Sequence, residues 1–234
     1  MTVQHYPIIL GIAQDQRGAK IYPDTADAAV SVPSEIRQKI LDRDDNSCRY
    51  CGFKSGKYQE ISFLDGNTKN LQMNNLLISC IYCHQCFDLE KVAQMRSGVL
   101  VWLPEIEQID LHHIARAIYV SRISQGSMAE TAKAALEKVM GRREEAKKRL
   151  HTDDPYLLSI VMKDFMGPKQ YAVRDKKLDG VRLFPLDRRI IKEGDLEFNQ
   201  FPQILAYWRS KNGPFGGKAP TQWKNFYAKL SQVA

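Results

Sequence analysis

The first hundred residues have the apolar pattern of short strands and one helix. Residues 6–13 (YPIILGIA) form an apolar run that predicts a strand, and residues 19–22 predict a weaker one. Apolar positions at helical spacing after Pro33 predict a helix that leads directly into NSCRYCG at 46–52. Residues 58–64 (YQEISFL) alternate between apolar and polar positions, which is typical of a strand with one buried face.

A hairpin is expected to follow that strand. The sequence DGN at 65–67 is typical of a tight turn, and a second short strand is expected near 69–73. Residues 84–96 have the composition of a helix, and the apolar run VLVWL at 99–103 predicts a buried strand. The first part of the chain is therefore expected to be a small mixed unit of strands and helices.

The second half of the chain has mainly helical periodicity. The periodic stretches are 104–120, 127–150 and 153–167. Ser127 and Glu130 have the spacing of a capping box, with the serine at the N-cap. Residues 172–197 are rich in charge and contain only short apolar pieces, so we expect irregular structure or a β-hairpin there.

These changes of pattern predict an α+β protein in three parts. We expect a first domain at 1–104, a mainly helical region at 105–197 that packs on it, and an aromatic-rich segment at 198–234. The last segment contains Trp208 and Trp223, and large aromatic side chains bury much of their surface in folded proteins. We therefore expect these aromatic side chains to be buried.

Composition and charge narrow the classes of protein only a little. The chain has 234 residues, of which 44% are hydrophobic, and a formal net charge of +7. This basic balance is compatible with nucleic acid, an acidic membrane surface or an acidic protein as partner. No apolar run approaches the roughly 18 residues of a membrane-spanning helix, and the start of the chain lacks the basic region of a signal peptide. We therefore expect a cytoplasmic protein.

Two Cys-x-x-Cys pairs are the strongest chemical signal in the sequence. They contain four of the five cysteines, and the stretch between them is long enough for a hairpin. In a chain without an export signal, matched pairs favour a metal site over disulfides. Thiolates suit tetrahedral zinc, and each pair can direct two sulfurs at one ion. We therefore predict one structural zinc ion bound by Cys48, Cys51, Cys80 and Cys83.

Several other residues could bind metal or pack in the core. Cys86 has the register of an early helix position and is expected in the core. His84 could replace Cys83 as a ligand, although four cysteines already complete a tetrahedral site. His112 and His113 lie in the middle of a predicted helix, and we expect them to be surface or core residues.

The order of these motifs resembles that of the HNH endonuclease family. In that family a helix leads into Cys-x-x-Cys, then a hairpin, then Asn-Leu, a second Cys-x-x-Cys, a histidine and another helix. Here the resemblance covers roughly residues 35–97, with Asn75 and His84 at the matching positions. It implies a zinc-bound hairpin-and-helix core to which a mainly helical C-terminal half has been added. In the family, a second, catalytic metal is held by a residue of the first strand and by the final histidine.

The catalytic residues of that family are missing from this chain. Ser62 and Phe63 occupy the strand positions of the metal ligand and the general base. Phenylalanine accepts no proton and serine is a poor metal ligand, so we expect no catalysis. Asn75 and His84 are then expected in structural hydrogen bonds. Two alternatives stay open: a metal-dependent nuclease that uses His84 with Asp65, and a zinc module that binds nucleic acid.

The positions of the four cysteines, a degenerate HNH-like core after a strand-like start, and a helical second half are similar to the IcmJ/DotN family of type IVB (Dot/Icm) secretion components. The similarity covers most of the chain, and roughly the last 35 residues add little to it. This resemblance implies a non-catalytic, zinc-stabilised adaptor of the type IV coupling complex. Its expected partner is the C-terminal tail of the coupling ATPase DotL, bound as a helix in a groove or as an added strand. Its expected place is the cytoplasmic face of the inner membrane, where the complex recruits effectors.

Overall fold

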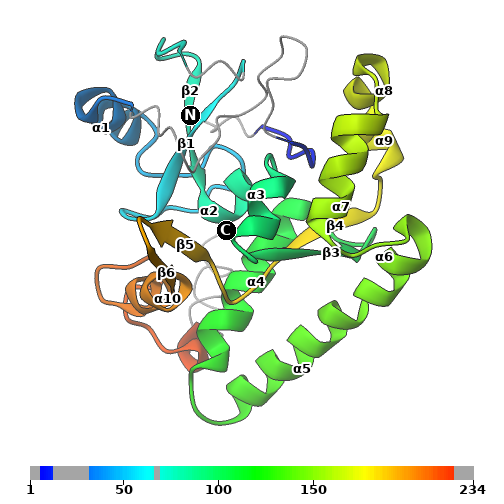
Figure 1. Cartoon of the computed structure of the whole chain (residues 1–234). Coiled ribbons are helices and arrows are strands. Elements are labelled where there is room, and N and C mark those ends of the chain that lie inside the picture. The colour runs from blue at the N-terminus through cyan, green and yellow to red at the C-terminus, as the bar shows by residue number, and fades with distance from the viewer. Residues whose placement is uncertain (1–5, 13–31, 66–68, 224–234) are drawn as a thin grey trace, which may run out of the picture.

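The computed structural model describes residues 6–12, 32–65 and 69–223 (Figure 1). Within these ranges the strands form three two-stranded antiparallel sheets with helices packed around them, which is the predicted α+β class. The strands are β1 (Gln59–Phe63), β2 (Leu76–Cys80), β3 (Gly98–Trp102), β4 (Val181–Pro185), β5 (Ile190–Glu193) and β6 (Leu196–Asn199). The helices are α1 (Ser34–Arg43), α2 (Ile81–Gln85), α3 (Leu89–Gln94), α4 (Gln108–Arg122), α5 (Ser127–Gly141), α6 (Arg143–Leu150), α7 (Pro155–Ile160), the π-helix η1 (Val161–Phe165), α8 (Pro168–Ala172), α9 (Arg174–Lys177), α10 (Phe201–Arg209) and the 3-10 helix η2 (Pro220–Gln222). No helix in this described part of the chain is both long enough and apolar enough to cross a membrane.

The first sheet pairs β1 with β2 and packs on α1. Ile61 lies opposite Ile78 in the register, and both side chains are buried in one cluster with Ile40 of α1. The strand predicted before the hairpin is therefore confirmed. Its partner was expected at 69–73, and this position is wrong. Residues 69–75 are mostly polar, whereas β2 (LLISC) supplies apolar side chains that the sheet can bury on both faces.

Asn75 closes the base of the loop between β1 and β2. Its backbone oxygen accepts from the N–H of Leu64 at 2.8 Å, and its side-chain oxygen accepts from the N–H of Asp65 at 2.9 Å. Asn75 therefore has the structural role that the sequence predicts. The turn predicted at 65–67 lies mostly outside the described residues.

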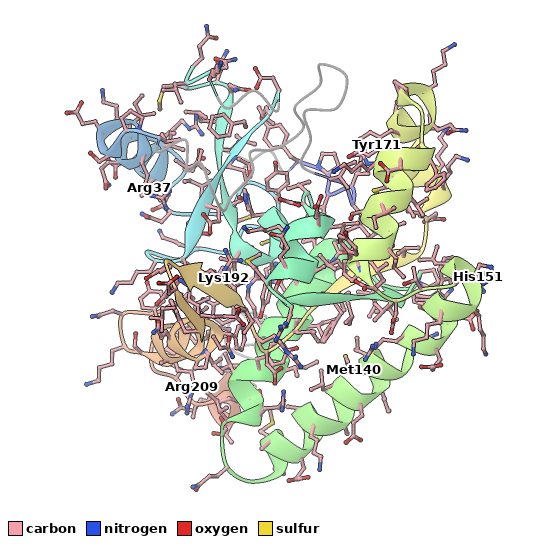
Figure 2. The ribbon with its side chains drawn as sticks, viewed as in Figure 1. Arg37, Met140, His151, Tyr171, Lys192 and Arg209 are labelled. Atoms are coloured by element: carbon pink, nitrogen blue, oxygen red, sulfur yellow. The ribbon has the colours of Figure 1, made fainter. Side chains whose placement is uncertain are left out.

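The N-terminal segment belongs to no sheet, so the strand predicted at 6–13 is wrong over the described residues 6–12. Gly11 instead exchanges backbone hydrogen bonds with Cys86 and Leu89, at the junction of α2 and α3. The N–H of Ile12 donates to the hydroxyl of Tyr171, labelled in Figure 2, at 3.1 Å. These partners are helix ends and side chains, so no ladder forms. The weaker strand predicted at 19–22 lies outside the described residues.

Two predicted helices are each divided in the structure. The helix expected at 84–96 is α2 followed by α3, because Asp88 leaves the helical conformation and caps α3 through its side chain. The helix expected at 127–150 divides at Arg142 into α5 and α6, and the Arg142 carbonyl accepts from the N–H of Trp102 on β3. A tertiary contact therefore accompanies the second break.

The capping box predicted at Ser127 does not form. The N-cap of α5 is Gly126, with φ of 80°, a left-handed backbone conformation that glycine adopts without strain. Ser127 is consequently the first helical residue and has no capping hydrogen bond. Helix α4 also begins later than expected, at Gln108, because residues 104–107 form a turn.

The second sheet joins segments that lie far apart in the sequence. Strand β3 pairs with β4, with Leu100 opposite Leu183, and both of these leucines are fully buried. The region 172–197 was expected to be irregular or a hairpin. It contains α9 and β4, while β5 pairs locally with β6. The hairpin expectation is therefore correct only for its last part.

The aromatic C-terminal segment packs on the region of the cysteines. Trp208 of α10 is 1% exposed, and its ring lies 5.6 Å from the rings of both Phe53 and Tyr82. The predicted burial is confirmed for this tryptophan. The largest hydrophobic cluster contains residues from the cysteine pairs, from α4 and from α10. The division into three parts at 104 and 197 stays a prediction.

We predict that Trp208→Ala lowers the free energy of unfolding by about 3–5 kcal/mol, because it leaves a large cavity in that cluster. Leu196→Ala is the matched control, since Leu196 is 62% exposed and its truncation should change stability by about 0.5 kcal/mol or less. Urea denaturation of both variants measures this difference. Equal stability of the two variants would show that the C-terminal segment is not part of the core.

Candidate metal centre

Two tight turns direct the four predicted sulfurs to one point. In the first turn the N–H of Gly52 donates to the carbonyl of Cys48 at 2.8 Å, and Gly52 has a φ of 72°. In the second, Cys80 ends β2 and its sulfur accepts from the N–H of Cys83 at 3.4 Å. The hairpin β1–β2 brings the two turns together, although they are far apart in the sequence.

The four cysteine sulfurs are buried and close-packed. Their Sγ atoms all lie within 4.8 Å of one another, and all four cysteines are free of disulfides. The Sγ atoms of Cys51 and Cys80 are 3.6 Å apart. Zinc–sulfur bonds of about 2.3 Å in a tetrahedron would place the sulfurs about 3.8 Å apart. The predicted residues are thus brought together at a spacing that suits a zinc ion.

A buried arginine lies against two of the four sulfurs. Arg116 of α4 is 1% exposed, and its Nη2 donates to Cys80 Sγ at 2.7 Å and to Cys51 Sγ at 3.7 Å. Its Nε and Nη1 are buried without a partner among the described residues. A buried cation without a counter-ion would cost many kcal/mol. A thiolate at Cys80, the form of cysteine that binds zinc, would supply that counter-ion.

The pKa values of the cysteines agree with this. Burial raises the pKa of Cys80, but hydrogen bonds from the other three thiols and the charge of Arg116 lower it more, so it lies well below that of a free thiol. The pKa of Cys83 is well above the usual value, first because of burial. Without metal, Cys80 therefore loses its proton more readily than Cys48 and Cys83, whose pKa values burial raises. A divalent ion with a preference for sulfur would displace the remaining protons, and this donor set fits zinc.

Helix α4 contributes a second donor, His112. The side-chain oxygen of Gln108 accepts a hydrogen bond from the N–H of Leu183 at 2.9 Å. The Nε2 of Gln108 donates to the backbone oxygen of Leu183 and to Nε2 of His112, both at 2.8 Å. Because His112 Nε2 is then the acceptor, Nδ1 carries the proton and donates to Cys83 Sγ at 3.4 Å. Burial lowers the pKa of His112 to about 3, which keeps this ring neutral.

The roles of Gln108, His112 and Arg116 were not predicted from the sequence. Their spacing of four residues places them on one face of α4, and that spacing is the signal that the sequence contains. His113 lies beside them, with Nε2 2.9 Å from the backbone oxygen of Cys51. His112 is a core residue, as expected, but one that also contacts a predicted ligand.

His84 lies outside the sulfur cluster. Its Nδ1 is 3.2 Å from Ser62 Oγ and 3.3 Å from Ser79 Oγ, and burial lowers its pKa. Ser62 is fully buried and Phe63 packs in the core. Ser62 and His84 thus face one another, as the resemblance to HNH endonucleases implies for these positions, but with a hydroxyl group where that family has a metal ligand.

Cys86 and Asp65 take no part in the cluster either. Cys86 is buried in a different hydrophobic cluster, as predicted, with Sγ 3.6 Å from His112 Nε2. Asp65 lies at the loop end of β1, where its carboxylate accepts from the side chain of Asn70 at 2.7 Å.

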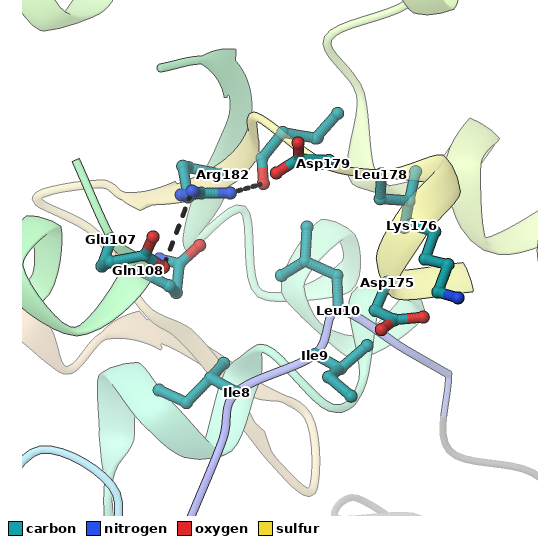
Figure 3. A pocket seen from close by; sticks show the side chains of 11 residues that line it. Ile8, Ile9, Leu10, Glu107, Gln108, Asp175, Lys176, Leu178, Asp179 and Arg182 are labelled. Atoms are coloured by element: carbon teal, nitrogen blue, oxygen red, sulfur yellow. Dashed lines mark hydrogen bonds and ion pairs between the residues drawn. The ribbon is translucent and has the colours of Figure 1, made fainter. Parts of the chain in front are cut away.

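A separate cleft of about 460 Å³ lies between residues 8–10, the start of α4 and the segment from α9 to β4 (Figure 3). Its most buried charged side chain, Arg182, donates to the backbone oxygens of Ile106 and Val181 at 2.7 and 3.1 Å. Gln108 is held by Leu183. These polar groups are engaged within the fold, so the sulfur cluster is the better candidate for a functional site.

Comparison with known proteins gives one informative relative. The chain is 29% identical over 160 residues to the type 4 apparatus protein DotN of Legionella pneumophila. The match covers 67% of this chain and 74% of that protein. No family model matches the chain.

We predict that Cys80→Ser abolishes stoichiometric zinc binding and unfolds the N-terminal half. In structural sites the free energy of metal binding contributes directly to folding, on the order of 10 kcal/mol. Zinc analysis of the purified protein and circular dichroism measure the two effects. Cys86→Ser is the matched control, because it changes the cysteine outside the cluster and should retain one zinc per chain.

The His84→Ala variant distinguishes a zinc site with four cysteine ligands from a zinc site in which His84 is a ligand. It should retain zinc and cost about 1–2 kcal/mol through lost hydrogen bonds. A Cys80→Ser variant that is folded, free of zinc and unchanged in melting would contradict the prediction, as would loss of zinc in His84→Ala.

Proposed function

Because the chain belongs to the DotN (IcmJ) family of type IV secretion apparatus components, we propose that it is a non-catalytic adaptor stabilised by zinc. On this proposal it acts in the coupling complex of a type IVB (Dot/Icm) system, binds the C-terminal tail of the coupling ATPase DotL, and supports effector recruitment at the cytoplasmic face of the inner membrane. The observation that carries the proposal is the match to DotN over 67% of the chain.

The geometry of the sulfur cluster supports a structural role for zinc. Four cysteine ligands complete a tetrahedron and leave no position for water or substrate. The four cysteines are also buried in one hydrophobic cluster with Tyr82 and Trp208, whose rings meet edge to face. Its contribution is therefore to stability, since it ties β2, α2 and the first cysteine turn to one ion.

The contacts of His84 support the absence of catalysis. The ring faces two buried serine hydroxyls, and no acidic ligand or general base stands at the two strand positions Ser62 and Phe63. Arg189, whose side chain is 13% exposed, forms an ion pair at 3.3 Å with Glu60, the carboxylate on β1 nearest in sequence to these positions. An enzyme of the HNH type would need an exposed metal at this place.

An exposed apolar row on α7 and the π-helix η1 is the best candidate for the partner surface. We define the row as Leu157, Val161 and Phe165, which are 48%, 46% and 74% exposed. Their spacing of four residues places them along one side of the helical segment, which stands at the edge of the molecule in Figure 1. Exposed apolar side chains arranged in this way are typical of sites for an amphipathic helix.

The charge of this part of the chain indicates what kind of helix would fit. Residues 161–177 contain five basic and two acidic side chains. A tail segment with an apolar face and acidic flanks would therefore complement both the row and its surroundings. This is the chemistry that we propose for the bound segment of the coupling ATPase.

We predict that the double variant Leu157→Ser, Phe165→Ser binds the C-terminal tail of DotL about tenfold more weakly or worse, because both changes remove apolar anchors. Calorimetric titration with the tail fused to a carrier protein measures the affinity. Leu196→Ser on β6 is the control, since it removes an equally apolar, exposed side chain elsewhere. Unchanged affinity of the double variant would exclude the row, and no binding by the wild type would contradict the adaptor proposal.

We also predict that the wild-type chain does not cleave plasmid or linear DNA with magnesium, manganese or nickel. A site that lacks two of its reacting groups loses many orders of magnitude in rate. The double change Ser62→Asp, Phe63→His restores both types of side chain and is the positive test of the geometry. DNA cleavage by the wild type that disappears in His84→Ala would show that the protein is a nuclease and would contradict the non-catalytic proposal.

A further inference from the structure

The proposed zinc centre would carry a net negative charge in the protein interior. One zinc ion and four thiolates sum to a charge of −2, and the four cysteines are buried. Burial of an unpaired charge is costly, whereas burial of a hydrogen-bonded pair is much less so. The centre therefore needs a cation close to its sulfurs.

Arg116 has the position and the shape for this role. Its Nη2 lies 2.7 Å from Cys80 Sγ and 3.7 Å from Cys51 Sγ, so it reaches one sulfur from each cysteine pair. The planar guanidinium has several N–H groups in a fixed fork and can bridge two acceptors, which the single ammonium of a lysine does less well. None of the ion pairs formed among the described residues uses Arg116.

The cysteine turns themselves hold the guanidinium in place. Its carbon atom Cζ lies 4.0 Å from the ring centre of Phe53 and 5.0 Å from that of Tyr82. Tyr82 lies between the two cysteines of the second pair, and Phe53 follows the first pair. Each turn thus supplies one aromatic ring to the arginine and one sulfur that accepts its hydrogen bond. Aromatic faces attract a desolvated cation and restrict its orientation.

We propose that Arg116 is the bridging counter-ion of the metal centre and sets its affinity for zinc. This inference rests on the proposed zinc site. Helix α4 then has a function beyond packing, because it begins the second half of the chain and supplies Arg116 to Cys51 and Cys80 and His112 to Cys83. Outer contacts of this kind usually change metal affinity by 10- to 100-fold when they are removed.

The test compares three variants of the full chain. Arg116→Met removes the charge and both hydrogen bonds, Arg116→Lys keeps the charge without the fork, and Lys133→Met makes the same change of net charge at an exposed lysine of α5. Competition with a chromophoric chelator measures zinc affinity. Absorption of the cobalt-substituted protein measures thiolate coordination independently, through the sulfur-to-cobalt charge-transfer band.

We expect affinity to fall 10- to 100-fold in Arg116→Met, less in Arg116→Lys, and not at all in Lys133→Met. Equal affinity of Arg116→Met and Lys133→Met would overturn the proposal. If Arg116→Met does not fold, Arg116→Lys decides, because wild-type affinity in that variant contradicts a bridging role. A wild type without the thiolate–cobalt band would instead overturn the zinc site itself, which is a different result.

Discussion

Four cysteine sulfurs within 4.8 Å of one another, enclosed by the hydrophobic core, are the constraint on which the rest of the structure depends. The sheets around them have two strands each, and isolated two-stranded sheets are only marginally stable. They are joined by packing around the cluster. Strand β2 leads into the second cysteine turn, α4 places Arg116 and His112 against the sulfurs, and α10 packs Trp208 against Phe53 and Tyr82. On our account a zinc ion stabilises this arrangement. Arg116 partly neutralises the negative charge of the zinc ion and its four thiolates, which lowers the cost of burying that charge.

The features that the sequence predicted are the local ones. The helix before NSCRYCG, strand β1 and strand β3 each follow from the spacing of apolar residues within a few turns or pleats, and the structure confirms them. The convergence of Cys48, Cys51, Cys80 and Cys83 also follows from local motifs, because each tight turn arranges its own two sulfurs. Pairing of β3 with β4 could not be predicted in this way, since no turn joins the strands and many helices intervene. The contacts of His112 and Arg116 were missed for the same reason: their spacing on α4 is visible in the sequence, but the surface that the helix faces is decided by tertiary packing.

On the proposed function, the metal-stabilised scaffold serves binding, and the similarity to DotN supports that proposal. The chain contains the four cysteines followed by a histidine, while Ser62 and Phe63 stand where the HNH resemblance implies a metal ligand and a general base. Its basic charge of +7 does not by itself indicate nucleic acid, because many of the basic side chains of α6 lie in ion pairs with acidic neighbours. The exposed apolar row on α7 and η1 is more specific, since Phe165 is 74% exposed and neighbouring exposed apolar side chains are typical of an interaction surface.

The most direct test of this account is X-ray absorption at the zinc edge of the purified, full-length chain. Four sulfur neighbours at about 2.3 Å, with one zinc per chain, are the predicted result. A first shell that contains nitrogen or oxygen at about 2.0 Å would contradict it, because His84 or His112 would then be a ligand and the centre would not be a closed tetrathiolate. Absence of zinc from a folded protein would contradict the central claim outright.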